Sequence, residues 1–209
     1  MTHMIGIYGA SGCGRGIMPL ARAEFPAADL VFIDDGLGAA VVNGHPVLPW
    51  EAFLARNAPT RSVAIAIADS TIRERLAQRA MMAGVPLQAI RAATVVEMDD
   101  VQIAEGACLS PFVTLTSNIR IGKCFHANLY SYVEHDCLIG DFVTLAPGAK
   151  VNGAVTLGDH VYIGSGAVIR QGLTIGEGAV VGMGAVVTRD VPAGVTVVGN
   201  PARVMERSS

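Results

Sequence analysis

His135 and Asp136 are the adjacent residues of this sequence that are best suited to move a proton. An imidazole beside a carboxylate is the minimum needed for a general base tuned by a neighbouring charge. The pair stands in the hexad VEHDCL, at residues 133–138, and the repeat described below directs the histidine side chain away from the protein core. From spacing alone, a solvated turn remains open as the alternative interpretation.

A second group of residues, near the N-terminus, indicates recognition of phosphate and sugar. An apolar run at 4–8 leads into the glycine-rich turn GASGCG at 9–14, and a second apolar run at 30–33 ends at Asp34 and Asp35. Glycines let a backbone approach a phosphate, a helix N-terminus favours negative charge, and an acidic residue about twenty positions further on can bind a sugar hydroxyl. The spacing is GxxGxG rather than GxGxxG, so no NAD site is expected. A purely structural tight turn stays open.

The His135–Asp136 pair lies within a repeat of six residues, and this repeat must set its position. From Ile103 to Pro192 the chain divides into fifteen hexads, whose first position is Ile, Leu or Val in all but one. The fifth position is small or apolar throughout, and glycine is frequent at the second. Self-similarity at a short fixed period marks a solenoid, in which each unit buries its apolar face against its neighbours. We therefore predict a solenoid of fifteen hexads, with an unbroken register to residue 192.

The N-terminal residues 1–90 are predicted to form a small α/β domain with a Rossmann-like parallel sheet. Apolar runs at 4–8, 30–33 and 62–68 alternate with segments that can form helices, and a last strand is expected at 85–89. Asn43 and Gly44 predict a hairpin turn. Ser70 is expected to cap the second helix. Its arginines are expected to form a solvated face, and they are Arg73, Arg75 and Arg79.

Composition excludes several classes of protein. A net charge of −3 and a pI near 5.9 argue against a general nucleic-acid or membrane-surface partner. The mean hydropathy of +0.45 is high, but no apolar run approaches the ~20 residues of a spanning helix, and the N-terminus lacks the features of a signal peptide. The four cysteines show neither CxxC pairing nor metal spacing. We expect a cytoplasmic protein with reduced thiols and no metal.

The hexads resemble those of the hexapeptide-repeat acyltransferases. In that pattern the first position is aliphatic and the second is often glycine. Two variable residues follow, then a small residue and one further residue. The resemblance implies that residues 91–209 form a left-handed parallel β-helix of triangular section, with three hexads in each coil and therefore about five coils.

The whole chain resembles the nucleotide-sugar N-acetyltransferases of the bacillosamine and perosamine pathways, together with the sialic-acid O-acetyltransferases. The glycine-rich turn, the acidic pair and the AIAIA strand, joined to a hexapeptide β-helix, carry this resemblance. It implies that the N-terminal domain holds a nucleotide-sugar and the β-helix holds acetyl-CoA. A histidine usually follows the Ser-Gly pair, where this chain has a cysteine. The implied substrate-binding residues of this domain are Ser11, Gly12, Cys13, Asp34, Asp35 and Ala68.

The family's catalytic histidine lies in a His-Glu or His-Asp pair followed by Cys-x-Ile-Gly, and residues 135–140 read HDCLIG. The resemblance implies that His135 is the general base, that Asp136 tunes it, and that the backbone N–H of Gly153 stabilises the oxyanion. It also implies that Asn128 binds the sugar amine. His126 and His160 are expected to be exposed structural residues. The implied acetyl-CoA contacts are Thr144, Ser165, Met183 and, in the tail GNPAR, Pro201.

The resemblance implies an acetyl-CoA-dependent N-acetyltransferase that acts on the amine of a nucleotide-linked amino-sugar, as a homotrimer with sites between subunits. One alternative is a sugar O-acetyltransferase of the same fold. Another is a non-catalytic β-helix scaffold, including a carbonic-anhydrase-like one, which would need three metal-binding histidines that this solenoid does not present in matching hexad phase. The sequence leaves open the nucleotide (UDP, GDP or dTDP), the sugar and the glycan pathway.

Overall fold

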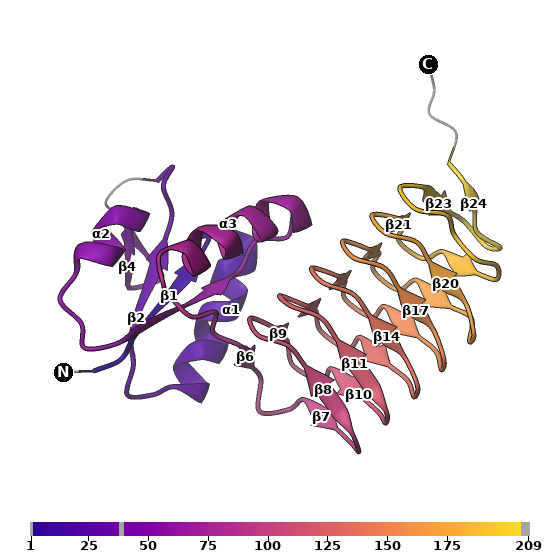
Figure 1. The fold of residues 1–209 in the computed structure, drawn as a ribbon, viewed down its shortest axis with the longest axis horizontal. Coiled ribbons are helices and arrows are strands. Elements are labelled where there is room, and N and C mark those ends of the chain that lie inside the picture. Colours follow the sequence, from indigo (N-terminus) through magenta and orange to yellow (C-terminus); the bar gives the residue numbers. More distant parts are fainter. Residues whose placement is uncertain (1, 38–39, 206–209) are drawn as a thin grey trace. The chain divides into compact units, whose positions relative to one another are not determined.

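The computed structural model describes residues 2–37 and 40–205, and the chain forms two compact units (Figure 1). The first reaches to Ala92 and includes Glu105–Cys108. The second comprises Ala93–Ala104 and the chain from Leu109 onwards. Each unit is built on a different principle, so each is described by itself.

The first unit is an α/β domain around a five-stranded sheet of order β3-β4-β2-β1-β5. Its central strands pair in parallel and are almost entirely buried, as in sheets covered on both faces. The predicted hairpin is present, with Val42 opposite His45. The strands are β1 (Met4–Tyr8), β2 (Asp29–Ile33), β3 (Ala40–Val42), β4 (His45–Leu48) and β5 (Arg61–Ile65). The helices are α1 (Gly12–Glu24), α2 (Trp50–Ala55) and α3 (Ser70–Met82), followed by the short strand β6 (Ile90–Arg91).

Three local predictions for this unit were wrong. Strand β5 ends at Ile65 and not at residue 68. Residues 85–89 form only a bridge between Val63 and Leu87, in a segment where Pro86 has no N–H to donate. Helix α3 is capped not by its Ser70 but by Asp69, whose side chain accepts the N–H of Ile72 at 2.9 Å.

Arg73 also contradicts the expected solvated face of α3, because its side chain is fully buried. Its guanidinium donates to the carbonyl oxygens of Ile67 and Ala68 at 2.8 and 3.1 Å. These carbonyls belong to the chain that follows β5, which needs other partners once it leaves the sheet. Arg75 is exposed as expected. Arg73 is therefore an internal anchor between α3 and the end of β5.

The second unit is a left-handed parallel β-helix, whose coils stack from β7 to β23 (Figure 1). The β13 face carries β7 (Val96–Glu97), β10 (Thr114–Leu115), β13 (Tyr132–Val133), β16 (Lys150–Val151), β19 (Val168–Ile169) and β22 (Val186–Val187). The β14 face carries β8 (Val101–Ile103), β11 (Ile119–Ile121), β14 (Leu138–Ile139), β17 (Thr156–Leu157) and β20 (Thr174–Ile175). The β15 face carries β9 (Cys108–Leu109), β12 (His126–Ala127), β15 (Thr144–Leu145), β18 (Tyr162–Ile163), β21 (Val180–Val181), β23 (Thr196–Val198) and the antiparallel β24 (Arg203–Val204).

The hexad phase predicted the core of the β-helix. Every predicted fifth position is buried, including Ser131, whose hydroxyl donates to the Asn128 carbonyl at 2.7 Å. The unbroken register is wrong for the last hexad: Val191 bridges Ile175, sixteen residues away, where strand pairs in the earlier coils are eighteen residues apart. Asp190 fixes this shortened turn by accepting the N–H of Thr174 at 2.9 Å.

Candidate active site

His135 lies on the corner of the β-helix between the β13 and β14 faces, here called the His135 corner, which is formed by the turns after β10, β13, β16, β19 and β22. Its side chain is 60% exposed, and its Nδ1 lies 2.8 Å from Oδ2 of Asp136. Asp136 has a φ of +59°, a left-handed conformation that aspartate tolerates better than most residues. The predicted pair is therefore formed, and it faces solvent.

Asp136 is held by a second partner that the sequence did not reveal. Asn118, one coil earlier, donates from Nδ2 to Oδ1 of Asp136 at 3.1 Å. The hydrogen bond with His135, followed by that with Asn118, lowers the pKa of the Asp136 carboxyl. An ionised Asp136 accepts a hydrogen bond from Nδ1–H, which leaves the lone pair of a neutral His135 on Nε2.

Gly153 lies one coil after His135, and the imidazole packs against its backbone. A Cβ there would lie 2.5 Å from Cε1 and 2.6 Å from Nε2 of His135, so no side chain fits unless the ring moves. Since a Cβ lies about 2.5 Å from its own nitrogen, the Gly153 nitrogen is within about 5 Å of Nε2. Its N–H donates to Oε2 of Glu134 at 3.1 Å. The implied oxyanion donor thus lies beside His135, and the carboxylate of Glu134, which the sequence did not single out, accepts its hydrogen bond.

Cys137 follows the pair but faces the core, as its hexad position predicts. Its Sγ is fully buried, lies 3.3 Å from the Asn152 carbonyl, and accepts the N–H of Val155 at 3.4 Å. Burial raises the pKa of the thiol to about 11. Cys137 is therefore a neutral packing residue that orders the corner, and it is not an activated nucleophile.

The residues with implied roles in cofactor or amine binding gather at a different edge of the β-helix. They follow or belong to successive strands of the β15 face, and they are Asn128, Thr144, Ser165, Met183 and Pro201. The turns after β9, β12, β15, β18 and β21 form what is here called the Ser165 corner, between the β15 and β13 faces. Within one β-helix, the His135 corner and the Ser165 corner are separated by the whole β13 face.

These side chains differ in how far solvent can reach them. Ser165 and Pro201 are exposed, and Met183 is 82% exposed. Thr144 is buried, with 4% exposure. Asn128 donates from Nδ2 to the Leu145 carbonyl at 2.9 Å. The side chains of Ser165 and Met183 are therefore accessible to a ligand, whereas the side chain of Thr144 has very little accessible surface.

His126 was expected to be exposed, and that is wrong. It lies in β12, between β9 and β15, and is only 4% exposed. His160 is half-buried and stacks on Phe142, with ring centroids 5.3 Å apart. Both residues are structural, and they lie away from the His135 corner.

A groove of about 630 Å³ runs along the β14 face, over β8, β11, β14 and β17. Leu138, only three residues after His135, lines it and is 54% exposed. Arg120 also lines it, and its guanidinium lies 2.8 Å from a carboxylate oxygen of Asp100. The groove gives the surface next to the His135 corner room for a ligand.

In the first unit, the backbone of the turn at residues 9–14 explains why two of its positions are glycine. Gly9 has a φ of +106°, and a Cβ on Gly14 would overlap the Gly9 carbonyl oxygen. A Cβ on Gly12 would meet nothing. Ser11 precedes α1 and is exposed, and its side chain makes no capping hydrogen bond. Cys13 is half-buried, and burial raises the pKa of its thiol more than Arg73 lowers it.

Asp34 shapes the turn after β2. Its Oδ1 accepts the N–H groups of Gly36 and Leu37 at 3.0 and 3.2 Å, and its Oδ2 lies 3.3 Å from the nitrogen of Ala10. The carboxylate therefore joins the end of β2 to the glycine-rich turn.

Asp35 is held by three donors. Its Oδ1 accepts the N–H of Trp50 at 2.8 Å, and its Oδ2 accepts from the Tyr8 hydroxyl at 2.7 Å and from Arg79 at 2.6 Å. Partial burial raises the pKa of Asp35, but these hydrogen bonds lower it further than burial raises it. Beside them lies a cavity of about 520 Å³, which Asp35 and Arg79 help to line.

Within residues 2–37 and 40–205, no helix is both long and apolar enough to cross a membrane. No three His, Cys, Asp or Glu side chains in these ranges are grouped so as to hold a metal ion.

Comparisons with known proteins agree with both units. Residues 4–80 match the PglD N-terminal domain, and residues 154–189 match the bacterial transferase hexapeptide (six repeats). The chain is 48% identical to a GDP-perosamine N-acetyltransferase from Escherichia coli O157:H7, over 99% of this chain and 98% of that protein.

Solved structures match the chain over nearly its whole length. WeeI from Acinetobacter baumannii AYE is 55% identical, with a TM-score of 0.96 over 98% of this chain and all of that one. PerB from Caulobacter crescentus, in complex with CoA and GDP-perosamine, is 28% identical, with a TM-score of 0.88 over 97% of both chains. The acetyltransferase domain of PglB from Neisseria gonorrhoeae, in complex with acetyl coenzyme A, is 29% identical, with a TM-score of 0.88 over 98% of this chain and all of that one. This chain therefore belongs to the nucleotide-sugar N-acetyltransferases of the bacillosamine and perosamine type, within the hexapeptide-repeat acyltransferases.

Proposed function

We propose that this enzyme transfers the acetyl group of acetyl-CoA to the amine of a nucleotide-linked amino-sugar, with His135 as the general base. The observation that carries this proposal is the exposed His135–Asp136 pair, with Nε2 free, packed against the backbone of Gly153. A GDP-linked sugar is the first substrate to test, because the relatives from Escherichia coli and Caulobacter crescentus are named for GDP-perosamine or are bound to it.

The reaction needs only a proton acceptor and an oxyanion donor. The amine nitrogen attacks the thioester carbonyl while Nε2 of His135 takes its proton, and the Asp136 carboxylate stabilises the imidazolium that forms. The N–H of Gly153 stabilises the oxyanion. When the C–S bond breaks, the imidazolium returns the proton to the CoA thiolate.

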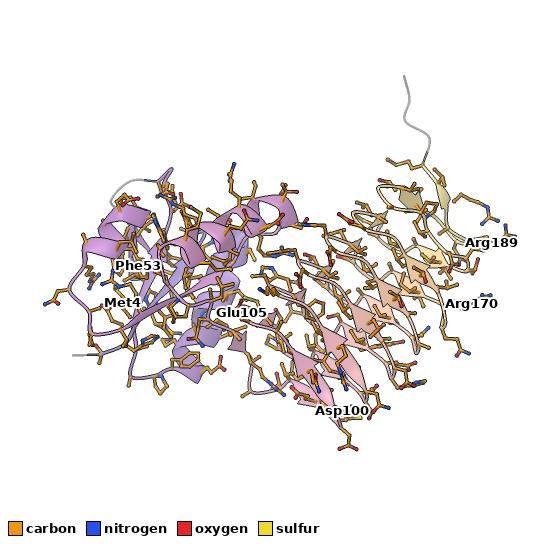
Figure 2. The ribbon with its side chains drawn as sticks, viewed as in Figure 1. Met4, Phe53, Asp100, Glu105, Arg170 and Arg189 are labelled. Carbon is orange, nitrogen blue, oxygen red and sulfur yellow. The ribbon has the colours of Figure 1, made fainter. Side chains whose placement is uncertain are left out.

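Acetyl-CoA is proposed to lie along the β-helix, with Ser165, Met183 and Pro201 among its contacts. Arg170 and Arg189 extend this set, since both lie on the His135 corner, two and three coils beyond the base, and project into solvent (Figure 2). Coils repeat every ~4.8 Å, which places them about 10 and 14 Å along the axis from His135. Two exposed cations there can bind the phosphates of a cofactor whose thioester reaches Nε2.

The nucleotide-sugar is proposed to bind the first unit. Ser11 and the N-terminus of α1 have exposed donors for its diphosphate. Asp34, Asp35, Cys13 and Ala68 stay candidates for contacts, although both carboxylates already hold their own domain together.

A homotrimer with shared sites is proposed because one β-helix separates the two halves of the site. Within one copy, the proposed base lies on the His135 corner with Arg170 and Arg189, whereas the proposed contacts Ser165 and Met183 lie on the Ser165 corner. Packing β13 faces around a threefold axis brings the His135 corner of one copy to the Ser165 corner of the next. Light scattering is expected to give three times the chain mass, and a monomer would contradict the shared site.

The function is tested by incubating the enzyme with acetyl-CoA and GDP-perosamine, and by following release of the CoA thiol and the mass of the sugar product. UDP- and dTDP-linked 4-amino-sugars test the nucleotide, and a hydroxyl analogue tests the O-acetyltransferase alternative. A thermal-shift comparison of GDP, UDP and dTDP reports the nucleotide independently of turnover. Failure to acetylate any of the amines would contradict the proposal.

A further inference from the structure

Glu134 stands beside the proposed base, and none of the steps above uses it. It follows β13 on the His135 corner, and its Oε2 accepts the N–H of Gly153 at 3.1 Å. The His135 ring packs on the same glycine. In this structure a carboxylate therefore occupies the backbone donor that acetyl transfer requires.

The two uses of the Gly153 N–H exclude each other. An oxyanion that develops next to the Glu134 carboxylate would be repelled by it, because two like charges would share one donor. Glu134 must therefore leave Gly153 before the thioester oxygen can take its place. Something in the reaction must attract the carboxylate elsewhere.

The amino-sugar supplies that attraction. An alkyl amine arrives largely as an ammonium ion, which carries three N–H donors and a positive charge. A carboxylate binds such a group by charge-assisted hydrogen bonds. A sugar hydroxyl carries no charge, so it provides no comparable pull.

The coil before Glu134 carries a buried hydroxyl, that of Thr116, at the same corner. Thr116 holds the same corner position one coil before Glu134, and the N–H of Thr116 donates to the carbonyl of Val133, the residue before Glu134, at 3.1 Å. Within residues 2–37 and 40–205, no hydrogen-bond partner is found for the buried Thr116 hydroxyl. It lies on the opposite side of Glu134 from Gly153 along the corner.

We propose that Glu134 is the carboxylate that receives the ammonium group of the amino-sugar, and that its movement frees the Gly153 N–H for the thioester oxygen. This inference rests on the proposed N-acetyltransferase function. The ammonium loses one proton to solvent as it becomes the attacking amine, and a second proton passes to Nε2 of His135. The C–N bond forms, the C–S bond breaks, and the CoA thiolate takes the proton from His135. Glu134 thereby selects amines over hydroxyls.

The test uses Glu134→Gln, which keeps a hydrogen-bond acceptor for Gly153 but removes the charge. Calorimetry measures the binding of two nucleotide-sugars, one with the amine and one with a hydroxyl in its place, to the full-length enzyme in the presence of CoA. The wild type is expected to prefer the amine by about tenfold or more, the usual worth of a charged hydrogen bond. In Glu134→Gln the two affinities are expected to converge, and kcat/KM for the amine to fall with KM for acetyl-CoA unchanged. Glu177→Gln, an exposed residue on another corner, is the matched control and is expected to behave as the wild type.

An unchanged amine-to-hydroxyl ratio in Glu134→Gln, or an equal loss for both sugars, would overturn the proposal and leave Glu134 as a structural support of Gly153. Glu134→Asp gives a second test, because a shorter carboxylate is expected to keep part of the preference that Gln loses. If the wild type fails to acetylate the amine at all, the proposed function fails. If it acetylates the amine and the ratio survives in Glu134→Gln, only this inference fails.

Discussion

The two units of this enzyme differ in how they use polar side chains. In the α/β unit, single polar residues join elements that are distant in sequence: Arg73 binds the chain after β5, and Asp35 joins Tyr8, Trp50 and Arg79. In the β-helix, apolar hexad positions and a repeated backbone ladder form the core, and the candidate catalytic pair lies exposed at a corner. Chemistry can thus be altered in the β-helix with little effect on stability, whereas in the α/β unit the two are coupled.

His135→Ala is expected to show the largest effect and to separate rate from stability. Loss of a positioned base lowers kcat by ~10²–10⁴. The side chain is 60% exposed, so the melting temperature and the affinity for acetyl-CoA are expected to stay close to their wild-type values. Steady-state kinetics and calorimetry measure the two quantities. Near-normal turnover at both pH 6 and pH 8 would reduce His135 to a solvated turn residue.

Arg73→Met is expected to show the opposite behaviour, a loss of stability in the α/β unit. It removes two hydrogen bonds from the buried guanidinium to the carbonyls of Ile67 and Ala68, and a hydrogen bond that involves a charged group contributes about 1.5–3 kcal/mol. Trp50 is the single tryptophan of the chain and is buried in this unit, so its fluorescence during urea unfolding reports the unit directly. Arg75→Met on the same helix is the exposed control. Equal midpoints for the two variants would contradict the anchor role.

The same difference explains how much the sequence predicted. A hexad repeat is a local pattern, so the buried positions and the outward direction of His135 follow from counting along the chain. The partners of His135 also obey a period, since Asn118 and Gly153 lie one coil before and one coil after the pair. The contact between Glu134 and Gly153 was missed, because a period gives the neighbouring coil but not the direction of a long side chain.

In the α/β unit the central strands β1, β2 and β5 were predictable from apolar runs, but the tertiary partners were not. Arg73 has the composition of a surface residue, and only the path of the chain after β5 makes it an internal donor. Asp35 occupies a position typical of a sugar-binding carboxylate, yet three internal donors hold it. Sequence spacing identified the acidic pair without showing what it binds.

Asp136→Asn is expected to fall between the wild type and His135→Ala in kcat. Asparagine can still accept a hydrogen bond from Nδ1 of His135, but it lacks the charge that stabilises the imidazolium. The loss is expected to be smaller than in His135→Ala because the carboxylate of Asp136 is not itself the proton acceptor. Asn118→Ala, which removes the donor to the other oxygen of Asp136, is expected to have a smaller effect still. The measurement is kcat for the three variants under one set of conditions. A loss in Asp136→Asn as large as that in His135→Ala would mean that the carboxylate takes a direct part in proton transfer.

The smallest expected effect is the pH dependence that the Asp35 carboxylate gives to the stability of the α/β unit. The pKa of Asp35 is lowered in the folded protein, whereas an aspartate in an unfolded chain titrates near 3.9. Its ionised form therefore stabilises the fold fully above about pH 4, and this contribution is lost as the pH falls through the lower, folded pKa. The side chain is 44% exposed, so solvent screening limits the gain to below about 1 kcal/mol. Urea midpoints from Trp50 fluorescence are expected to be lower for Asp35→Asn than for the wild type at pH 6, and the gap is expected to narrow between pH 4 and pH 2.5. A gap that stays constant over this range would show that the hydrogen bonds of Asp35, and not its charge, support the unit.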